Sequence, residues 1–284
     1  RPRMSSAGVT VTLAGGLGNQ LFQWAVGYAV SKKLGVRLRL DPSQIRRNDR
    51  ALSPRRFHLD YFSIAAPWSR PPIVEQARRQ FKKREISSRR VFTESGFRFD
   101  NRINAVQPGT RLVGHFQSWR YFDSHAMEIR DVLSGGAMPT PAYTALKQKL
   151  DGKSWVGVHV RRGDYINFPD IFSILDSNYY SRALDRLDLT GIDEVVVFSE
   201  EWSDARDLIP DATIFADASM IAHPGDVVLL LSEADHVIGA NSTLSWWGAY
   251  LNTKDHSEKI FPSNWFGPKG WPIDDLMPTT WRTI

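Results

Sequence analysis

Short β-branched runs alternate with helical segments along this 284-residue chain, and this alternation constrains the fold more than any other feature. The first run, residues 9–14, ends in a Gly-Gly-Leu-Gly turn at 15–18, after which apolar residues recur at helical spacing over 19–34. A second run at 36–40 ends at Asp41-Pro42. This order predicts a βαβ unit with parallel strands.

The second half of the chain repeats the same alternation. We expect strands at 154–160, 195–199, 213–215, 236–239 and 259–261, and helices at 179–187, from about 201, at 226–234 and at 243–251. The pattern is weak between 50 and 109, where one helix is expected near 73–83, and a strand is expected at 111–116. Because Gly and Pro cluster between 135 and 152, we expect two α/β domains, at 8–140 and 152–284.

The composition excludes several classes of protein. With 42% hydrophobic and 24% charged residues, the chain is neither disordered nor fibrous. The absence of Cys removes thiolate metal sites, cysteine nucleophiles and disulfides, and it is typical of a reducing cytosol. No run approaches the 18 or so apolar residues that span a bilayer. We therefore expect a cytoplasmic protein.

Charge is divided unevenly between the two halves. Residues 1–150 hold 26 Lys and Arg against 10 Asp and Glu, a formal charge of +16, whereas residues 151–284 hold 10 against 21, a charge of −11. The densest basic stretch lies at 78–90. It is either a solvated helix face or a surface for something anionic, such as the inner face of a membrane. No nucleic-acid-binding motif accompanies it, so we expect no nucleic-acid partner.

The glycine turn is the first candidate site. Gly16, Gly18, Asn19 and Gln20 lie where a strand gives way to a helix, and main-chain N–H groups there favour an anion such as a phosphate. The turn is not a dinucleotide fingerprint, because Leu21 occupies the third glycine position. The alternative is a tight turn with no ligand.

The second candidate site is the run His-Val-Arg-Arg-Gly-Asp-Tyr at 159–165. It begins at the carboxyl end of an expected buried strand, which is the edge where open α/β sheets bind ligands. His159 and Arg161 share one face of that strand, and an Arg there can neutralise a diphosphate. Arg162 has the equally strong alternative of a structural ion pair, for example with Asp164.

The third candidate site combines Asp226 with Asn241, Ser242 and Thr243. The last three residues lie between an expected strand and an expected helix, so they can cap the helix or hold a phosphate. The chain contains no phosphate-loop, zinc-protease or serine-hydrolase motif, and no Asp-x-Asp pair for a metal that carries a nucleotide. A diphosphate site without a metal and without a cofactor is therefore expected.

These three motifs, together with Phe-Ser-Glu-Glu-Trp at 198–202 and Gly-His-Phe-Gln-Ser at 114–118, resemble the inverting α-1,2-fucosyltransferases of glycosyltransferase family 11. The resemblance covers roughly residues 9–266. It implies a GT-B-type α/β fold in which two Rossmann-like domains face each other across a cleft. The second of these would bind GDP-fucose, and the first would lie on the acceptor side.

The resemblance also assigns roles to residues. Arg161 would contact the donor β-phosphate, His159 and Asn241 to Thr243 would lie near the nucleotide, Asp226 would bind guanine, and Ser242 would contact phosphate. His115 and Gln117 would lie on the acceptor side. Candidates for the base that deprotonates the acceptor are Asp164, then Glu200 and His115.

The function implied is transfer of L-fucose from GDP-β-L-fucose to the 2-hydroxyl of a galactose-terminated glycan, with inversion and without a metal, as in O-antigen or other glycan biosynthesis. One alternative is an inverting transferase that uses another nucleotide-sugar. The other is a noncatalytic basic module that binds nucleic acid or membrane. That module would leave the second and third motifs unexplained.

Overall fold

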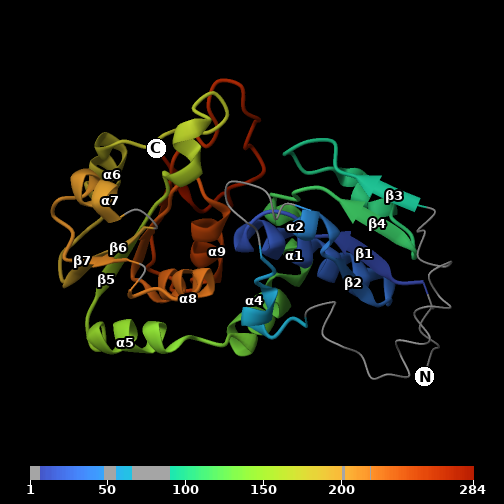
Figure 1. Cartoon of the computed structure of the whole chain (residues 1–284), viewed down its shortest axis with the longest axis horizontal. Helices are drawn as coiled ribbons and strands as arrows, with labels where there is room; N and C mark the ends of the chain where they lie inside the picture. Colours follow the sequence, from blue (N-terminus) through green and yellow to red (C-terminus); the bar gives the residue numbers. More distant parts are fainter. Residues whose placement is uncertain (1–6, 48–55, 66–89, 200–201, 218) are drawn as a thin grey trace. The chain divides into compact units, whose positions relative to one another are not determined.

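The computed structural model describes residues 7–47, 56–65, 90–199, 202–217 and 219–284. The chain divides into two compact units. Unit 1 comprises residues 1–136 together with Asp274–Leu276, and unit 2 comprises Ala137–Ile273 together with Met277–Ile284. Figure 1 shows the strands of each unit side by side in a sheet of their own. The helix expected at 73–83 lies outside the described residues.

Unit 1 contains a four-stranded parallel sheet in the order β2-β1-β4-β3. Its strands are β1 (Val9–Thr12), β2 (Leu38–Asp41), β3 (Arg90–Thr93) and β4 (Thr110–Val113). Its α-helices are α1 (Leu17–Leu34), α2 (Ser43–Arg47) and α4 (Ala126–Gly136). Its 3-10 turns are η2 (Leu59–Phe62), η3 (Asn101–Ala105), η4 (Trp119–Tyr121) and η5 (Asp123–His125).

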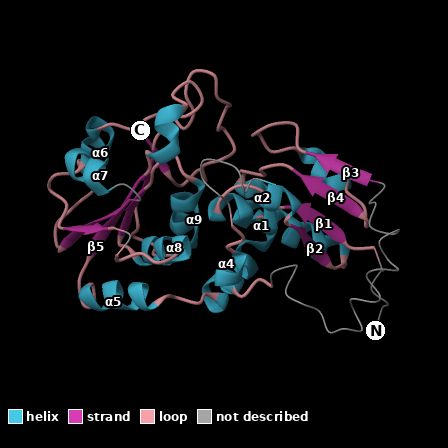
Figure 2. Ribbon diagram, viewed as in Figure 1, coloured by secondary structure: helices cyan, strands magenta, loops and turns pink. Residues whose placement is uncertain are grey.

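Unit 2 contains a six-stranded parallel sheet in the order β10-β9-β8-β5-β6-β7. Its strands are β5 (Trp155–Val160), β6 (Glu194–Ser199), β7 (Ile214–Ala216), β8 (His236–Ile238), β9 (Lys259–Phe261) and β10 (Arg282–Thr283). Its helices are α5 (Pro141–Lys149), η6 (Gly163–Asn167), α6 (Ser177–Leu184), α7 (Trp202–Leu208), α8 (Pro224–Glu233) and α9 (Thr243–Leu251). Figure 2 shows helices bordering the strands of each sheet.

The strand order of each sheet reverses at one place. In unit 1 the chain moves outward from β1 to β2, and it then builds β3 and β4 on the other side of β1. In unit 2 it moves from β5 through β6 to β7, and it then places β8, β9 and β10 on the other side of β5. The two switch points therefore lie between β1 and β4 and between β5 and β8. Open α/β sheets bind ligands outside the carboxyl ends of the strands at such points.

The prediction of an α/β chain with two Rossmann-like units is confirmed by the two parallel sheets. Helix α9 and strand β9 have the expected bounds, while β1, at Val9–Thr12, ends two residues earlier than expected. The sequence pattern missed β3, because its four residues stand in an Arg-rich stretch without periodicity. It also missed the return of Asp274–Leu276 to unit 1. Asp274 and Asp275 form ion pairs with Arg98 and Arg120, more than 150 residues away in the sequence, and no local pattern encodes such pairs.

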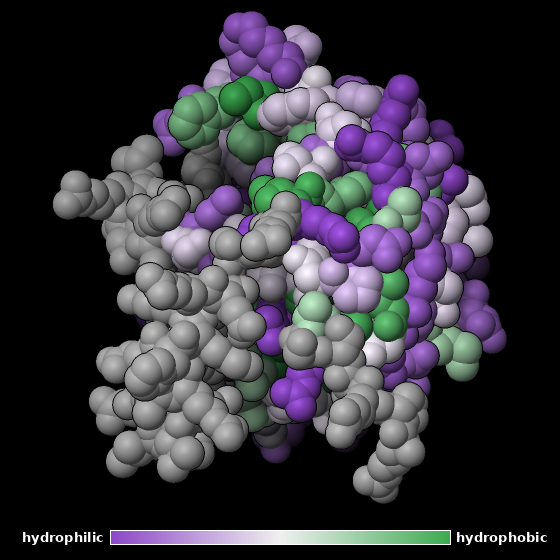
Figure 3. All heavy atoms as spheres, turned by 90° about the vertical axis from the view of Figure 1, so that its right-hand side faces the viewer, coloured by the Kyte–Doolittle hydropathy of each residue, from purple (hydrophilic) through white to green (hydrophobic). Residues whose placement is uncertain are grey.

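Apolar side chains account for the packing within each unit. In unit 2, Gly248 of α9 lies against Leu231 of α8, where an added Cβ would approach the Leu231 Cβ to 2.5 Å. Trp246 and Trp247 of the same helix are fully buried. In unit 1 the large hydrophobic side chains that the described residues expose are Val91 and Met127. Figure 3, which views the molecule from the side of unit 1, shows green spheres only in small groups among purple ones.

Candidate functional site

The glycine turn of unit 1 lies at the carboxyl end of β1, at the switch point. Gly15 has φ +76°, and a Cβ there would approach Asn19 Nδ2 to 2.4 Å, so only glycine fits. Gly16 is the N-cap residue of the 18-residue helix α1, and no side chain caps this helix. Gly18 and Asn19 belong to its first turn. The main-chain N–H groups and the dipole of this helix favour an anion at this end.

Two buried glutamines hold this turn in place. Gln20 Nε2 donates to the carbonyl oxygens of Gly15 (3.0 Å) and Arg56 (2.7 Å), and its Oε1 accepts from the His58 N–H (3.0 Å). Gln23 Oε1 accepts from the Ala14 N–H (2.9 Å), and its Nε2 donates to the Gly114 carbonyl (3.1 Å). Gln20 therefore has a structural role in this structure, and its contact with a nucleotide stays a prediction.

The loop after β4 meets the glycine turn. Gln117 is buried, and its Nε2 donates to Asn19 Oδ1 at 3.0 Å. His115 is exposed and stacks on Phe97, with ring centroids 5.4 Å apart and planes 14° apart. The structure thus brings the two predicted acceptor-side residues and Asn19 together at one switch point, within unit 1.

In unit 2, His159 lies in β5 at the switch point and is 5% exposed. Among the described residues, no hydrogen-bond partner reaches its buried Nδ1. Burial, with a smaller contribution from the Arg161 charge, lowers the pKa of His159 to about 3, so its ring is neutral near pH 7. A buried polar atom without a partner is costly unless a ligand supplies one.

Arg161 follows β5 directly and is held by an aromatic stack. Its guanidinium carbon lies 5.5 Å from the centroid of the Tyr165 ring, and Tyr165 stacks on Phe172 at 4.1 Å with planes 6° apart. The Tyr165 hydroxyl donates to the carbonyl oxygen of Asn241 at 3.2 Å. Tyr165 therefore links the arginine motif to the loop after β8. The backbone of Asp164 lies in η6, and the position of its side chain is outside what the structure describes.

Asn241 and Ser242 lie on the other side of the same switch point, between β8 and α9. Asn241 Nδ2 donates to the carbonyl oxygens of Ser173 (2.8 Å) and Trp265 (2.9 Å), which orients the amide. Its buried Oδ1 has no hydrogen-bond partner in the described part of the chain. Ser242 is the N-cap of α9, and its Oγ accepts from the Leu244 N–H at 3.3 Å. Thr243 begins the helix and is partly exposed.

Asp226 is fully buried at the N-terminus of α8. Its Oδ1 accepts from the Thr140 N–H (3.2 Å), and its Oδ2 accepts from the Thr140 hydroxyl (2.6 Å) and the His223 N–H (3.3 Å). Both oxygens are therefore bonded within unit 2. Guanine binding by Asp226 therefore stays a prediction.

The sequence reasoning missed several residues that shape these edges, namely Gln23, Glu94, Tyr121 and Thr140, and it gave no separate role to Tyr165. Glu94 carried no clear local signal, because the short strand that it follows lies in an Arg-rich stretch without periodicity. Glu200, a candidate base, lies outside the described residues. The described residues contain no group of three or more His, Asp or Glu side chains that could hold a metal ion. They also contain no helix long and apolar enough to cross a bilayer.

Comparison with known proteins places the chain in a family. It matches the sequence model of glycosyl transferase family 11 over residues 2–269. An α-1,2-colitosyltransferase of Escherichia coli is 27% identical, and the alignment covers 97% of this chain and 98% of that protein. The O-antigen biosynthesis glycosyltransferase WbnK of the same species is 28% identical over 89% of this chain and 93% of that protein.

A vertebrate relative shows the same kinship. Galactoside alpha-(1,2)-fucosyltransferase 2 of Oryctolagus cuniculus is 25% identical, and the alignment covers 91% of this chain and 70% of that protein. The resemblance expected from the three motifs is thus confirmed by a match across most of the sequence. The protein is a glycosyltransferase and belongs to glycosyl transferase family 11.

Proposed function

We propose that this glycosyltransferase moves L-fucose from GDP-β-L-fucose to the 2-hydroxyl of a terminal galactoside, with inversion and without a metal ion. The observation that carries the proposal is the edge of unit 2 between β5 and β8. There the buried Nδ1 of His159 and Oδ1 of Asn241 lack partners among the described residues, and Arg161 follows the same strand as His159. Such an edge suits a polar, anionic ligand such as a nucleotide diphosphate.

Arg161 is proposed as the main electrostatic group of the reaction. As the sugar leaves, negative charge develops on the departing GDP. A guanidinium stays protonated at any working pH, so it can stabilise this charge without a metal. Ser242 and the N-terminal end of α9 add hydroxyl and main-chain donors at the same edge. Asp226 is proposed to bind guanine after Thr140 has released its carboxylate.

The acceptor hydroxyl must lose a proton during inversion. Asp164 is the first proposed base because it follows Arg161 closely in the chain, and Glu200 and His115 are the next candidates. His115 and Gln117, at the switch point of unit 1, are proposed to contact the acceptor galactoside.

A direct test incubates the protein with GDP-fucose, EDTA and a panel of β-galactosides, and determines the linkage and anomeric configuration of the product. An α-1,2-linked fucoside formed in EDTA supports the proposal. GDP-mannose tested in parallel separates fucosyl transfer from the use of another nucleotide-sugar. Activity that disappears in EDTA and returns with Mg²⁺ or Mn²⁺ would contradict the metal-free mechanism.

A second donor is favoured by one observation, namely the similarity to a colitosyltransferase over 97% of the chain. Colitose is fucose without its 3-hydroxyl group, so the two donors differ by one polar group. A site built to bond that hydroxyl would reject colitose strongly, whereas an apolar pocket would accept both. Parallel kcat/KM measurements with GDP-fucose and GDP-colitose decide which donor the site prefers.

The basic first half is proposed to bring the protein to an anionic membrane surface, while nucleic acid is not an expected partner. Residues 78–89, the densest part of this charge, lie outside the described residues. Sedimentation with phosphatidylserine vesicles at low and high salt tests the proposal, because binding through basic residues weakens as salt increases.

A further inference from the structure

The network around Glu94 in unit 1 serves none of the roles proposed above. Glu94 directly follows β3, and its carboxylate is partly buried beneath the loop that follows β4. Its Oε2 accepts from the N–H groups of both His115 and Phe116 at 2.8 Å, and its Oε1 accepts from the Tyr121 hydroxyl at 3.0 Å. One carboxylate therefore binds the main chain at the two residues that precede Gln117.

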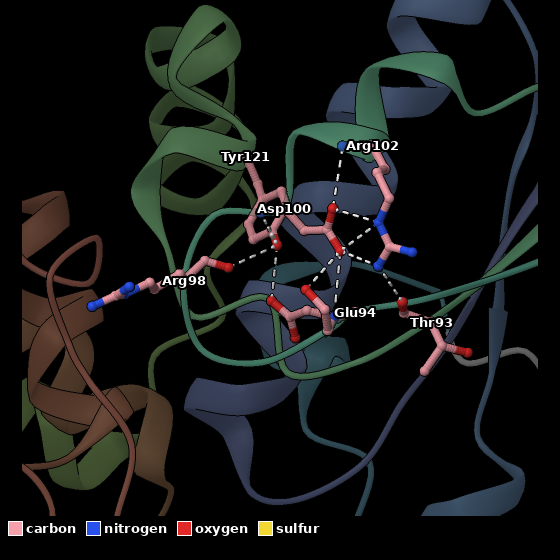
Figure 4. A network of polar contacts seen from close by, with 7 residues as sticks. Thr93, Glu94, Arg98, Asp100, Arg102 and Tyr121 are labelled. Atoms are coloured by element: carbon pink, nitrogen blue, oxygen red, sulfur yellow. Dashed lines mark hydrogen bonds and ion pairs between the residues drawn. The ribbon is translucent and has the colours of Figure 1, made fainter.

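The hydroxyl of Tyr121 orients the carboxylate from the other side. It accepts from the Asp100 N–H at 2.9 Å, and the nearer acceptor for its own proton is the Glu94 carboxylate at 3.0 Å, since the Arg98 carbonyl oxygen lies 3.5 Å away. Asp100 is held in turn by Ser95 and Arg102. Figure 4 shows the Glu94 carboxylate and the Asp100 main chain converging on the hydroxyl of Tyr121. All three partners of Glu94 donate to it, which suits the ionised form, although burial raises the pKa of Glu94 above its usual value.

The bonded loop has an unusual backbone. Phe116 has φ +54°, a left-handed conformation that a bulky residue adopts only at an energetic cost. At Gly114 an added Cβ would approach the Glu94 Cβ and Oε2 to 2.6 Å, so glycine is needed for the carboxylate to lie this close. The two N–H bonds to Glu94 offset the cost at Phe116. The resulting turn lets Gln117 reach Asn19 and leaves the His115 ring exposed on Phe97.

From this arrangement we propose that Glu94 is a positioning residue, which sets the conformation of loop 114–118 so that His115 and Gln117 can receive the acceptor. This inference rests on the proposed function, in which those two residues lie on the acceptor side. Glu94 is not the catalytic base in this account. Three donors already occupy its carboxylate, and it acts through the main chain that it binds.

The test compares two conservative variants that preserve different properties of Glu94. Glu94→Gln keeps the length and an oxygen that can accept both N–H bonds, but it loses the charge. Glu94→Asp keeps the charge but is one methylene too short to hold the loop at the same distance. Positioning predicts that Glu94→Gln keeps kcat/KM for the acceptor within about fivefold, while Glu94→Asp loses about 30-fold or more, because small displacements of positioning groups are costly.

Donor handling is measured separately, as hydrolysis of GDP-fucose in the absence of acceptor. We expect this rate to stay within about threefold of the wild-type rate in both variants, because the loop acts on the acceptor. Glu128→Gln is the matched control, since Glu128 is an exposed carboxylate of the same unit, bonded to Lys32. Circular dichroism and thermal unfolding establish that each variant is folded.

The possible results distinguish a failure of the proposed function from a failure of the positioning role of Glu94. A wild-type protein that neither transfers nor hydrolyses GDP-fucose contradicts the proposed function. If wild-type transfer occurs and Glu94→Asp equals or exceeds Glu94→Gln, the carboxylate acts as a base and the positioning role is wrong. The role is equally wrong if both variants match the wild-type protein. Should Glu94→Asp fail to fold, Tyr121→Phe takes its place, with an expected loss of about three- to tenfold at the acceptor and none in hydrolysis.

Discussion

The two switch points of this protein satisfy their polar groups in different ways. Between β1 and β4, the amides of Gln20 and Gln23 and the carboxylate of Glu94 are all bonded within unit 1. In the described part of that edge, the Thr12 hydroxyl is the buried side-chain group without a partner. Between β5 and β8, a ring nitrogen of His159 and an amide oxygen of Asn241 are both buried without one among the described residues.

The edge of unit 2 therefore has more buried polar atoms left for a ligand than the edge of unit 1. In unit 1 the side chains of Gln20, Gln23 and Glu94 form hydrogen bonds that hold the loops in one conformation without a ligand. In unit 2 the loop after β8 is held by two tyrosine hydroxyls. Tyr179 donates to the Gly239 carbonyl oxygen (2.6 Å), and Tyr165 donates to the Asn241 carbonyl oxygen (3.2 Å). His159 Nδ1 and Asn241 Oδ1 keep no partner among the described residues. Substitution of Gln23 in unit 1 should therefore reduce stability, and substitution of Arg161 or Tyr165 in unit 2 should reduce turnover.

The largest effect is expected at Arg161. Replacing it with Ala should lower kcat by about 10² to 10³, the cost of losing one group that stabilises charge in a transition state. The unfolding temperature should change little. Arg186→Ala, a substitution of an exposed arginine in the same unit, is the matched control. Near-normal turnover of a folded Arg161→Ala variant in a GDP-fucose assay would contradict the proposal that Arg161 stabilises the negative charge on the departing GDP.

The buried ring of His159 should make stability depend on pH. Its pKa is about 3 in the folded protein and near 6.5 when unfolded, so the unfolded chain takes up the proton first. Its contribution to stability is complete above pH 6.5 and is lost as the pH falls toward 3. The loss should be on the order of 3 kcal/mol by pH 4, measured by urea unfolding.

The control for this pH dependence is a pair of variants. His159→Gln should flatten the slope between pH 6.5 and 4, whereas His256→Gln, at an exposed side chain, should leave most of it. An unchanged slope in His159→Gln would show that the acid sensitivity arises elsewhere in the molecule.

Gln23 tests the claim that unit 1 is held together by its own polar groups. Gln23→Ala leaves the Ala14 N–H and the Gly114 carbonyl without their side-chain partner, at a cost of about 2 kcal/mol in the free energy of unfolding. Urea unfolding monitored by fluorescence measures the change. Lys33→Ala, an exposed substitution on the same helix, should have little effect. A loss of turnover without a loss of stability would reverse the assignment of roles to the two edges.

The smallest effect is expected at Tyr165. Tyr165→Leu removes the ring beneath Arg161 and should reduce kcat by about five- to tenfold, as expected for one cation–π contact of about 1 kcal/mol. Tyr165→Phe keeps the ring and loses only the bond to the Asn241 carbonyl, so its loss should be about threefold or less. Equal losses in the two variants would show that the hydroxyl, rather than the ring, positions the arginine.

The parts of the site that could be predicted from the sequence are those whose residues are close neighbours along the chain. The glycine turn at 15–18 and the run at 159–165 carry their strand, their turn and their polar groups within a few positions, so local pattern placed them at the carboxyl ends of β1 and β5. The bonds of Glu94 to the loop after β4 join residues 21 and 22 positions apart, and no periodicity encodes such a pairing.

Local sequence pattern was enough to predict the parallel α/β sheets and the motifs of family 11, because strand and helix periodicity and short motifs are local properties of the chain. Which polar groups already have hydrogen-bond partners became apparent only in the folded structure. Asp226 and Gln20 look like ligand contacts in the sequence, and they are bonded within their own units, whereas His159 and Asn241 keep buried atoms without partners in the described structure. The physical reason is that hydrogen-bond satisfaction depends on distances between residues far apart in the chain, which only folding fixes.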